Sequence, residues 1–576
     1  MTRSSVSPYR ARMIGTRHMA AAGHYLAAQV ALQVLEAGGN AVDAGVAGGI
    51  TLGVVQSEYV CFGGVAPLMI YWAETDEVIS ISGLGTWPAL TDVDLFRRKY
   101  GGAMPPGLLR TIVPAAPDSW ITALELYGTF SFGQCAAEAV RFAREGFPVT
   151  ALMADIIADH ADDYRRWPQN AAIYLPGGQP PKAGDILVQT DLTNTISYMI
   201  DEEAAAARKG GREAGLQAAR DAFYKGDIAK TIVEYHRANG GWMRENDLAN
   251  FRVEVERPKS VSFEGADIFV CGPWCQGPVL GQTLAMLDGI DLKALGHNSV
   301  DYIHRLVETL KLAYGDRHEL YGDPNFVDVP LDTLLSSSYA QKRRALIDPD
   351  KAFPGMPEAG LPSNWGRNPD ADPRNGRRDP GELDTSYVCV VDKNNNAFSA
   401  TPSDGSIGAP VIPGLGFVPS ARGVQSFTHP DAPAVAGPGR RPRLTPSPAF
   451  ARKKGEWIMP FGSPGNDVQP QAMLQVYLNR HVFGMSMQEA VDAPRFATFS
   501  YPRSSIPHSY DPGLLKLEAR IDPAVAEELR AKGHNVQLWP EWEFAAGGVC
   551  SIHKDFNTRT LEGGSDSRRP TAVAGW

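Results

Sequence analysis

This chain of 576 residues has few cysteines, no excess of basic charge and no long apolar run. Six cysteines include one isolated C-x3-C pair, Cys271 and Cys275, without a second pair or neighbouring histidines. Reduced cysteines in a turn are therefore a better interpretation than a zinc site. The net charge of −10 argues against nucleic-acid partners and acidic membrane surfaces, because both require a basic face.

No segment reaches the roughly 18 apolar residues of a membrane-spanning helix. The first residues also lack the apolar core of a secretory signal. A cytoplasmic protein without membrane contact is the expectation.

Glycine and proline are abundant instead, with 58 and 44 residues spread along the chain. They are densest in residues 349–384, which contain seven prolines and five glycines. A loop of this length inside a folded protein is either functional or disordered. We interpret it as a flexible boundary between a helix-rich part, 1–384, and a second part, 385–576.

Hydrophobic periodicity and turn residues predict several elements around this boundary. A helix over 22–37 ends at Gly38 and Gly39, and Asn40 caps a second, small-residue helix. Most of 117–345 is predicted to be helical. The other expected elements are strands at 67–72, 386–391, 397–401 and 457–461, a turn at 393–396 and a helix at about 468–484.

Thr385 heads the predicted hairpin directly after the long loop. Cleavage before it frees a threonine whose hydroxyl is a nucleophile and whose α-amino group is the base. The α-amino pKa of about 8 suits a general base at neutral pH. Ser403 lies at the far end of the same hairpin. The cleavage site is therefore predicted between Asp384 and Thr385.

A glycine-rich turn, 462–467, joins the strand at 457–461 to the following helix. Backbone N–H groups in such a turn stabilise an oxyanion or a phosphate. The turn lacks the Gly-Lys-Ser/Thr ending of a phosphate loop, and Asp467 repels phosphate. An ordinary tight turn remains the alternative to an oxyanion site.

These landmarks resemble the gamma-glutamyltranspeptidase family of N-terminal-nucleophile hydrolases over nearly the whole length. The resemblance rests on ordered motifs at fitting spacings, namely GGNAVDA at 38–44, YGDPNFV at 321–327, TSYVCVVDK at 385–393, GSPG at 462–465 and GSDSR at 564–568.

The resemblance implies an α+β fold, a four-layer αββα sandwich, and self-cleavage into a large subunit, 1–384, and a small subunit, 385–576. It implies that Thr385 is the nucleophile and that the hydroxyl of Ser403 supports it. The backbone N–H groups of Gly465 and Asn466 fall at the oxyanion hole. The chemistry implied is amide attack, an acyl ester on Thr385, and release to water or an amine.

The family's substrate clamp is not retained. Leu84 stands where the γ-glutamyl enzymes have a carboxylate-binding arginine, and the stretch from Arg422 through Gln425 to Ser426 has no acid for the substrate amine. Leu444 and Thr445 replace a serine pair that also binds the carboxylate, and Asn466 replaces a second glycine. Charged hydrogen bonds contribute roughly 1.5–3 kcal/mol each. A different acyl group is therefore expected, as in the oxamate amidohydrolase branch.

Three hypotheses stay open: a threonine amidohydrolase acting on a small non-γ-glutamyl amide, a γ-glutamyltransferase or glutathione hydrolase, and an uncleaved binding or scaffold protein. Arg422, Arg441 and Arg443 are candidates to bind a substrate carboxylate, although structural roles are the better interpretation. No metal or organic cofactor is expected. The expected partners are the amide substrate and the two subunits of one precursor, with a homo-oligomer of such heterodimers left open.

Overall fold

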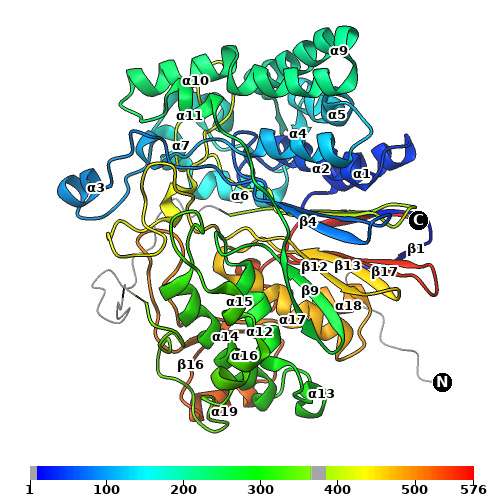
Figure 1. Ribbon diagram of the computed structural model, residues 1–576, viewed down its shortest axis with the longest axis vertical. Coiled ribbons are helices and arrows are strands. Elements are labelled where there is room, and N and C mark those ends of the chain that lie inside the picture. Colours follow the sequence, from blue (N-terminus) through cyan, green and yellow to red (C-terminus); the bar gives the residue numbers. More distant parts are fainter. Residues whose placement is uncertain (1–9, 364, 366–383) are drawn as a thin grey trace.

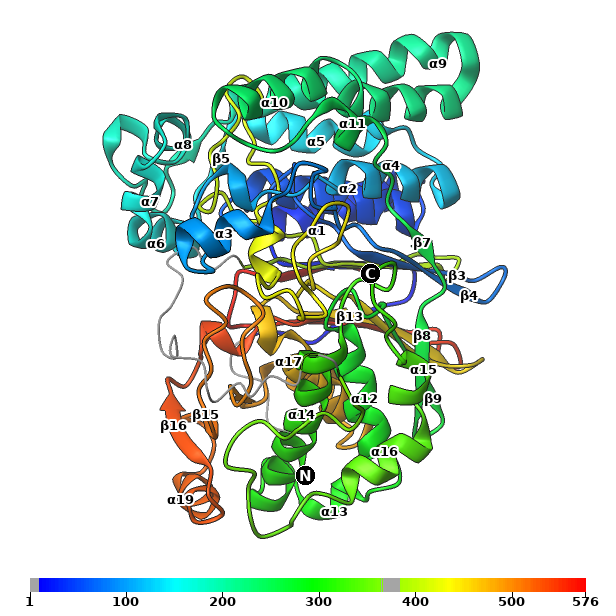
Figure 2. The ribbon, with the colours of Figure 1, turned by 60° about the vertical axis from the view of Figure 1, so that its left-hand side comes forward.

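Two stacked antiparallel sheets between two helical layers make up the computed structural model, which describes residues 10–363, 365 and 384–576 (Figure 1). The predicted α+β, four-layer αββα sandwich is confirmed. Figure 2 shows the same layering from another side. Among the described residues no helix is long and apolar enough to cross a membrane.

Each sheet has seven strands, drawn from both sides of the predicted cleavage point. The first sheet has the order β1 (Met13–Gly15), β18 (Leu561–Ser565), β17 (Cys550–Asp555), β13 (Trp457–Gly462), β12 (Ala449–Lys453), β9 (Ala266–Val270) and β8 (Lys259–Phe263). The second has the order β19 (Ala572–Gly575), β2 (Met19–Ala22), β10 (Val388–Val391), β11 (Ala397–Ala400), β3 (Leu68–Trp72), β4 (Glu77–Ile81) and β7 (Val255–Glu256). The two predicted subunits are thus interleaved in both sheets.

Helices from the first half of the chain cover the second sheet. They are α1 (Tyr25–Glu36), α2 (Ala41–Val55), α4 (Ala116–Tyr127), α5 (Phe132–Glu145), α9 (Thr190–Tyr224) and α10 (Asp227–Ala238). Asn40 forms a capping box with Asp43 at the start of α2, as the sequence predicts. The glycines of α2 allow close packing, since a Cβ at Gly45 would lie 2.1 Å from the ring of Phe398.

The opposite helical layer covers the first sheet with α12 (Gly277–Leu287), α14 (Val300–Leu320), α16 (Ser337–Arg344), α17 (Gln469–His481) and α18 (Met487–Asp492). A three-stranded sheet of β14 (Phe496–Thr498), β15 (Leu514–Glu518) and β16 (Asn535–Trp539) and the helix α19 (Pro523–Ala531) flank this layer. The remaining elements are α3 (Val93–Tyr100), α6 (Ala151–Asp159), α7 (Ala161–Arg165), α8 (Pro168–Tyr174), α11 (Glu245–Ala249), α13 (Leu292–Leu295), α15 (Leu331–Leu334), β5 (Phe147–Pro148) and β6 (Ile186–Leu187).

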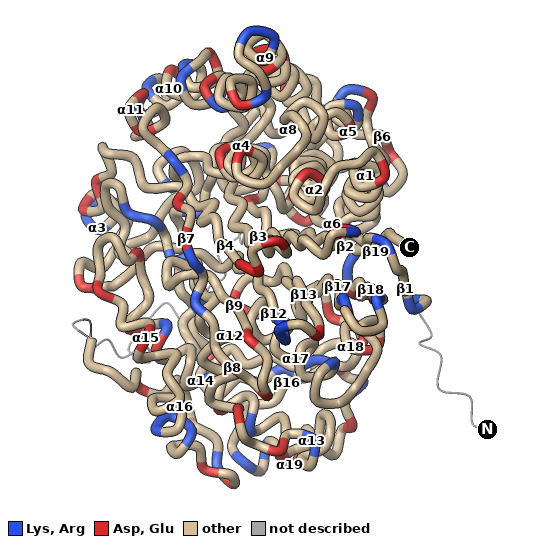
Figure 3. Tube along the Cα trace, turned by 45° about the vertical axis from the view of Figure 1, so that its right-hand side comes forward, with Lys and Arg blue, Asp and Glu red and all other residues tan. Residues whose placement is uncertain are grey.

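Successive side chains of a strand point to opposite faces of the sheet, and this alternation determines which residues form each part of the core. In β10, Val388 and Val390 face the helices, whereas Cys389 and Val391 face the other sheet. A strand buried on both faces is apolar at every position, which is why β10 has no polar residue within Val388–Val391. Charged residues of both signs are interspersed over the outer helices, and the central strands carry few (Figure 3).

Most predicted elements agree with the structure, including the hairpin and its turn. The helical interpretation of 117–345 misses β7, β8 and β9, of which β7 and β8 are edge strands and β9 lies between β8 and β12. These strands are short and lie between helical segments, so their periodicity is difficult to recognise in the sequence. The Glu264–Gly265 turn between β8 and β9 is the sequence feature that indicates a hairpin there. Within the predicted loop 349–384, residues 364 and 366–383 lie outside the described residues.

Candidate active site

Thr385 lies at the open end of the β10–β11 hairpin, opposite Ser403. The antiparallel register that pairs Val388 with Ala400 continues beyond the strands, so Thr385 and Ser403 form an isolated bridge. Their hydroxyl oxygens are 2.8 Å apart, and both residues are buried. The structure thus brings together the two hydroxyls that the sequence analysis singled out.

The peptide bond between Asp384 and Thr385 is the one at which the sequence predicts cleavage. Its carbonyl oxygen, on Asp384, accepts hydrogen bonds from Ser403 Oγ at 2.7 Å and from Arg422 Nη2 at 2.6 Å. Preorganised donors, one of them cationic, stabilise the negative charge that develops on a carbonyl oxygen under attack. This arrangement polarises the Asp384 carbonyl next to the hydroxyl of Thr385.

The hydroxyl of Ser403 links the nucleophile to that carbonyl. Arg422 Nη2 contacts Ser403 Oγ and can only donate. Ser403 has one proton, and the Asp384 carbonyl oxygen can only accept it, so Ser403 accepts a hydrogen bond from Thr385. A proton can therefore leave Thr385 for Ser403 while the Ser403 proton moves to the carbonyl oxygen.

The amide of Gln469 lies on another side of the Thr385 hydroxyl. The amide nitrogen satisfies two backbone carbonyls when it faces Ser463 O at 3.3 Å and Thr445 O at 3.0 Å. The amide oxygen then faces Thr385 Oγ1 at 3.4 Å. Because the one proton of the Thr385 hydroxyl is donated to Ser403, the Gln469 amide makes a polar contact with Thr385 Oγ1 in this orientation but accepts no hydrogen bond from it.

Arg422 is buried and is held by Asp404, whose Oδ1 lies 3.8 Å from Arg422 Nε. Ser420 Oγ and the backbone N–H of Ala421 also donate to the Asp404 carboxylate. Burial raises the pKa of Asp404 to about 6, and the Arg422 charge opposes this shift. Burial lowers the pKa of Arg422 below its usual value, whereas Asp404 and Asp384 favour its charged form. The guanidinium is thus fixed in place at the scissile carbonyl.

The turn at 462–467 supplies backbone N–H groups on the same side. Gly465 has φ +117°, a conformation that favours glycine, and its N–H donates to Asp384 Oδ1 at 2.9 Å. Asn466 follows with φ +50° at the start of the helical segment that continues into α17. These are the two residues predicted for the oxyanion hole.

Asp467 anchors this turn to the rest of the fold. Its carboxylate contacts Arg317 and accepts from Ser504 N at 2.9 Å and Ser504 Oγ at 2.6 Å. Burial raises the pKa of Asp467, but Arg317 and Ser504 outweigh burial, so the net shift is downward. The turn is consequently held by a charged group rather than by local backbone bonds alone.

A cavity of about 660 Å³ opens at these groups. Its walls include Asp384, Gly465 and Asn466 together with Arg569 and Phe544. Another cavity, of about 720 Å³, lies beside the Asp392–Asn396 turn at the opposite end of the hairpin. We assign the candidate site to the first cavity because its wall contains Asp384, at the predicted cleavage site, and the turn predicted to hold the oxyanion.

The sequence profile of gamma-glutamyltranspeptidases matches residues 27–576. The chain belongs to this family. It is 33% identical to the Acylase ACY 1 proenzyme of a Pseudomonas strain, over 97% of this chain and 94% of that one. It is 28% identical to the oxamate amidohydrolase proenzyme of Klebsiella pneumoniae, over 98% and 99%. The crystal structure of a cephalosporin acylase from Bacillus halodurans superposes with a TM-score of 0.83 at 26% identity, covering 100% and 99%.

Family membership makes the chain an N-terminal-nucleophile hydrolase made as a precursor that is cleaved into a large and a small subunit.

None of the predicted substrate-binding residues is among the residues that line the cavity at Asp384 in the described structure. Leu84 and Leu444 are buried in the apolar layer between the sheets. Gln425 Nε2 donates to Thr445 Oγ1 at 2.8 Å, and Thr445 N donates to Gln425 Oε1 at 3.0 Å. Arg422 binds the Asp384 carbonyl, as described above. These contacts are internal to the protein.

The other two candidate arginines have structural partners. Arg441 Nη2 pairs with Asp323 at 2.8 Å and its Nη1 with Glu254 at 2.9 Å. Arg443 Nη1 donates to the backbone oxygen of Arg317 at 3.0 Å, and its guanidinium lies over the ring of Phe427. Neither arginine is on the wall of the cavity at Asp384.

Sequence reasoning missed Arg569 and Glu58, which both line the cavity. Burial raises the pKa of Glu58 to about 8, so this carboxyl is protonated at neutral pH. Arg569 Nη1 lies 2.8 Å from Asp384 Oδ2. The sequence signal for Arg569 was its position directly after the GSDSR motif, which ends at Arg568.

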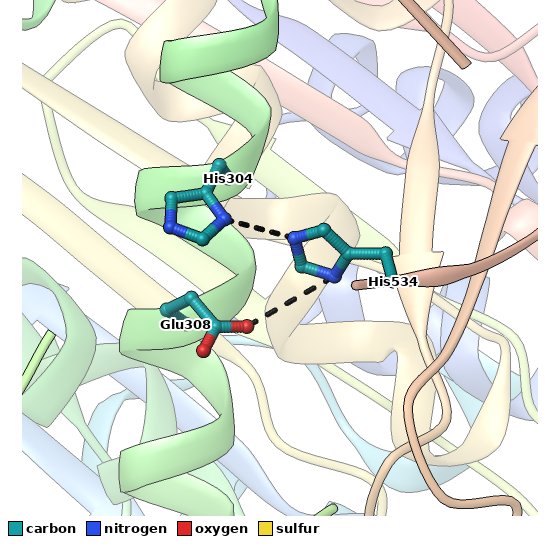
Figure 4. Close-up of side chains that lie close together, drawn as sticks. All are labelled: His304, Glu308 and His534. Carbon is teal, nitrogen blue, oxygen red and sulfur yellow. Dashed lines mark hydrogen bonds and ion pairs between the residues drawn. The ribbon is translucent and has the colours of Figure 1, made fainter. Parts of the chain in front are cut away.

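A separate buried group, the histidine cluster, consists of His304, Glu308, Lys311 and His534. Figure 4 shows three of its members. His304 Nε2 donates to Asp348 O at 2.8 Å, so His304 Nδ1 accepts from His534 Nε2 at 2.9 Å.

Each oxygen of the Glu308 carboxylate already lies next to a cationic or N–H group of the protein. Lys311 Nζ lies 2.8 Å from Glu308 Oε1, and Phe353 N donates to Glu308 Oε2 at 2.6 Å. The ammonium of Lys311 occupies the place that a bound cation requires. We assign the histidine cluster a structural role, which is to tie α14 to residues 348–353 at the start of the long loop.

Proposed function

We propose that this protein is a self-processing threonine amidohydrolase that hydrolyses a small amide whose acyl group is not γ-glutamyl. The observation that carries the proposal is the Asp384 carbonyl oxygen, bonded to Ser403 and Arg422 beside the Thr385 hydroxyl. These contacts set up one specific peptide bond for attack by its own neighbouring side chain.

Self-cleavage begins when Thr385 Oγ1 attacks the carbonyl carbon of Asp384. The Thr385 proton passes to Ser403, and the Ser403 proton passes to the carbonyl oxygen, which Arg422 also stabilises. The C–N bond then breaks as the carbonyl reforms and the proton on its oxygen moves to the leaving nitrogen, so that an ester joins Asp384 to Thr385 Oγ1 and Thr385 has a free amino group. Water hydrolyses this ester, giving subunits 1–384 and 385–576.

The mature reaction repeats this attack on an external amide. The freed α-amino group of Thr385 accepts the proton of Oγ1 as the acyl ester forms, and later returns it to the departing amine. The N–H groups of Gly465 and Asn466 stabilise the oxyanion. A water molecule then releases the acid, and an amine acceptor in its place would make the reaction a transfer.

A non-γ-glutamyl acyl group is supported by two observations. Leu84 and Leu444 are apolar and buried where the family's γ-glutamyl enzymes are expected to bind the substrate carboxylate. Relatives at 33% and 28% identity are named an acylase and an oxamate amidohydrolase. Glutathione hydrolysis or γ-glutamyl transfer is the second candidate, since the family bears that name.

Intact-mass spectrometry and an ammonia-release assay test the proposal together. Wild-type protein should yield two fragments, the smaller beginning at Thr385, and should hydrolyse members of a small-amide panel. Ordinary turnover of a γ-glutamyl anilide would favour the second candidate. A chain that stays whole and inactive after long incubation would favour the scaffold interpretation instead.

A further inference from the structure

Gln276 is a buried glutamine whose side chain joins the oxyanion turn, residues 462–467, to a second backbone segment near the nucleophile. It directly precedes α12, and its Nε2 donates to Asn466 O at 2.7 Å and to Thr445 O at 3.0 Å. Its Oε1 accepts from Arg317 Nη1 at 3.1 Å. Because a guanidinium can only donate, this contact fixes which end of the amide is the oxygen. Both hydrogens and the oxygen of the amide are thus engaged inside the protein.

Two consecutive carbonyl oxygens of the oxyanion turn are held in this way by side chains. Asn466 O accepts from Gln276, and Asp467 O accepts from Tyr314 Oη at 2.5 Å. At the start of a helical segment the N–H groups point in the direction opposite to the carbonyl groups. The hydrogen bonds to the carbonyl oxygens therefore turn the N–H groups of this segment toward the cavity, whose wall contains Asn466.

Asn466 needs such support because its backbone conformation is unfavourable. Its φ of +50° lies in the left-handed region, which residues other than glycine adopt at a cost in free energy, and such conformations persist where surrounding contacts hold them. The hydrogen bond from Gln276 is a contact of this kind. Gln276 is itself anchored by Arg317, which also contacts the Asp467 carboxylate and donates to Pro502 O at 2.9 Å.

Thr445 O links the oxyanion turn to the nucleophile. When the amide nitrogen of Gln469 faces Thr445 O at 3.0 Å, the amide oxygen lies 3.4 Å from Thr385 Oγ1. Gln276 Nε2 donates to the same Thr445 oxygen. A chain of two side-chain amides and one backbone carbonyl therefore runs from the oxyanion turn to Thr385, and it fixes the spacing between them.

Self-cleavage places a different demand on the site. In the uncleaved chain the Asp384 carbonyl oxygen accepts from Ser403 and Arg422, and Gly465 N is engaged with the Asp384 carboxylate. The donors for self-cleavage are therefore Ser403 and Arg422, whereas the hydrolysis of an external amide uses the N–H groups of the oxyanion turn. A residue that orients only the turn should affect hydrolysis and spare self-cleavage.

We propose that Gln276 is a positioning residue for amide hydrolysis, which holds the N–H groups of Gly465 and Asn466 at the spacing from Thr385 that the tetrahedral intermediate requires. This inference rests on the proposed amidohydrolase function. An N–H group stabilises the oxyanion only at about 2.7–3.1 Å from that oxygen, so a small shift of the turn removes much of its effect. Gln276 is not among the residues that line the cavity in the described structure, and it acts through Asn466 and Thr445.

Two substitutions of Gln276 and one matched control test the inference. Gln276→Met keeps the length of the side chain and removes its hydrogen bonds. Gln276→Glu keeps the shape and the contact with Arg317 but replaces the donating NH2 group with an oxygen. Gln282→Met is the control, because Gln282 is also buried and lies on α12, where it binds Asp316 Oδ2 at 3.0 Å and Tyr321 Oη at 2.5 Å instead of the oxyanion turn.

Two rates are measured on each full-length protein: self-cleavage by mass spectrometry over time, and ammonia release by the cleaved protein from oxamate, propionamide and benzamide. For the amide that the wild type hydrolyses fastest, kcat of both Gln276 variants should fall about 10- to 100-fold, because the oxyanion donors are misplaced rather than removed. KM and the rate of self-cleavage should change less than about threefold, since the affected contacts are made only in the transition state of hydrolysis. Gln282→Met should leave kcat unchanged.

An unchanged kcat in either folded Gln276 variant, or equal slowing of self-cleavage and hydrolysis, overturns the inference and leaves the proposed function in place. The same conclusion follows if both Gln276 variants fail to fold while Gln282→Met folds, because Gln276 then has a purely structural role. Wild-type protein that cleaves itself but releases ammonia from none of the three amides contradicts the proposed function, and the inference with it.

Discussion

The residues around Thr385, namely Ser403 and Arg422, and the histidine cluster are both buried, polar and hydrogen-bonded. They differ in the chemical group toward which their hydrogen-bond donors point. Ser403 and Arg422 converge on a peptide carbonyl at the edge of a cavity. In the histidine cluster, Lys311 and the N–H of Phe353 face the Glu308 carboxylate, a group that does not break or form bonds. Buried polar groups therefore indicate catalysis only where their donors are aimed at a bond that can break.

Removing the nucleophile should have the largest effect. We expect Thr385→Ala to abolish both self-cleavage and amide hydrolysis, because the attacking oxygen is lost. Its free energy of unfolding should stay within about 1 kcal/mol of the wild type, since a small side chain is shortened. Gel analysis, the ammonia assay and denaturant unfolding check these outcomes, and cleavage of the Ala variant would exclude Thr385 as the nucleophile.

Removing the guanidinium of Arg422, which donates to the Asp384 carbonyl oxygen, should slow self-cleavage without stopping it. Loss of one oxyanion donor costs about 100- to 1,000-fold in rate, so Arg422→Met should cleave that much more slowly. Arg443→Met is the matched control, because Arg443 is also a fully buried arginine but does not contact Asp384. Equal slowing of both variants would indicate a general packing defect rather than a role at the carbonyl.

The histidine cluster should respond to substitution in stability rather than in rate. Glu308→Gln leaves the ammonium of Lys311 buried without its anion, which costs about 3–5 kcal/mol of unfolding free energy. Replacing both residues, as in Glu308→Met with Lys311→Met, should recover much of this loss. Denaturant melts supply the stabilities, and a selective loss of activity in the folded Gln variant would contradict a structural role.

The smallest expected effect is a loss of folding stability in acid that comes from His534. Burial, with Lys311 nearby, lowers the pKa of His534 to about 2. Unfolded His534 binds a proton below about pH 6.5 and the folded form does not, so stability falls as pH drops below that value. The slope per histidine is at most about 1.4 kcal/mol per pH unit. Thermal melts of His534→Gln between pH 6.5 and 4 should fall less steeply than the wild type.

Local patterns predicted much of the fold. The helix before Gly38, the Asn40 cap and the β10–β11 hairpin depend on residues close in sequence, and each lies where the pattern placed it. Strands β8 and β9 escaped prediction, because β9 pairs with β12, which is far away in the sequence, and β8 is held in the sheet by its pairing with β9. Family motifs, rather than periodicity, indicated the αββα layers.

In the candidate site, too, some contacts follow from local sequence and others depend on segments that are far apart in the chain. Thr385 and Ser403 are 18 residues apart and face each other through one hairpin register, so the sequence alone determines their encounter. Arg422 reaches the Asp384 carbonyl, and Gly465 and Arg569 reach the Asp384 carboxylate, from loops separated along the chain and joined only by the packed sheets. Their roles were decided by tertiary structure, because long-range packing sets which distant side chains share a cavity, and no local spacing encodes that.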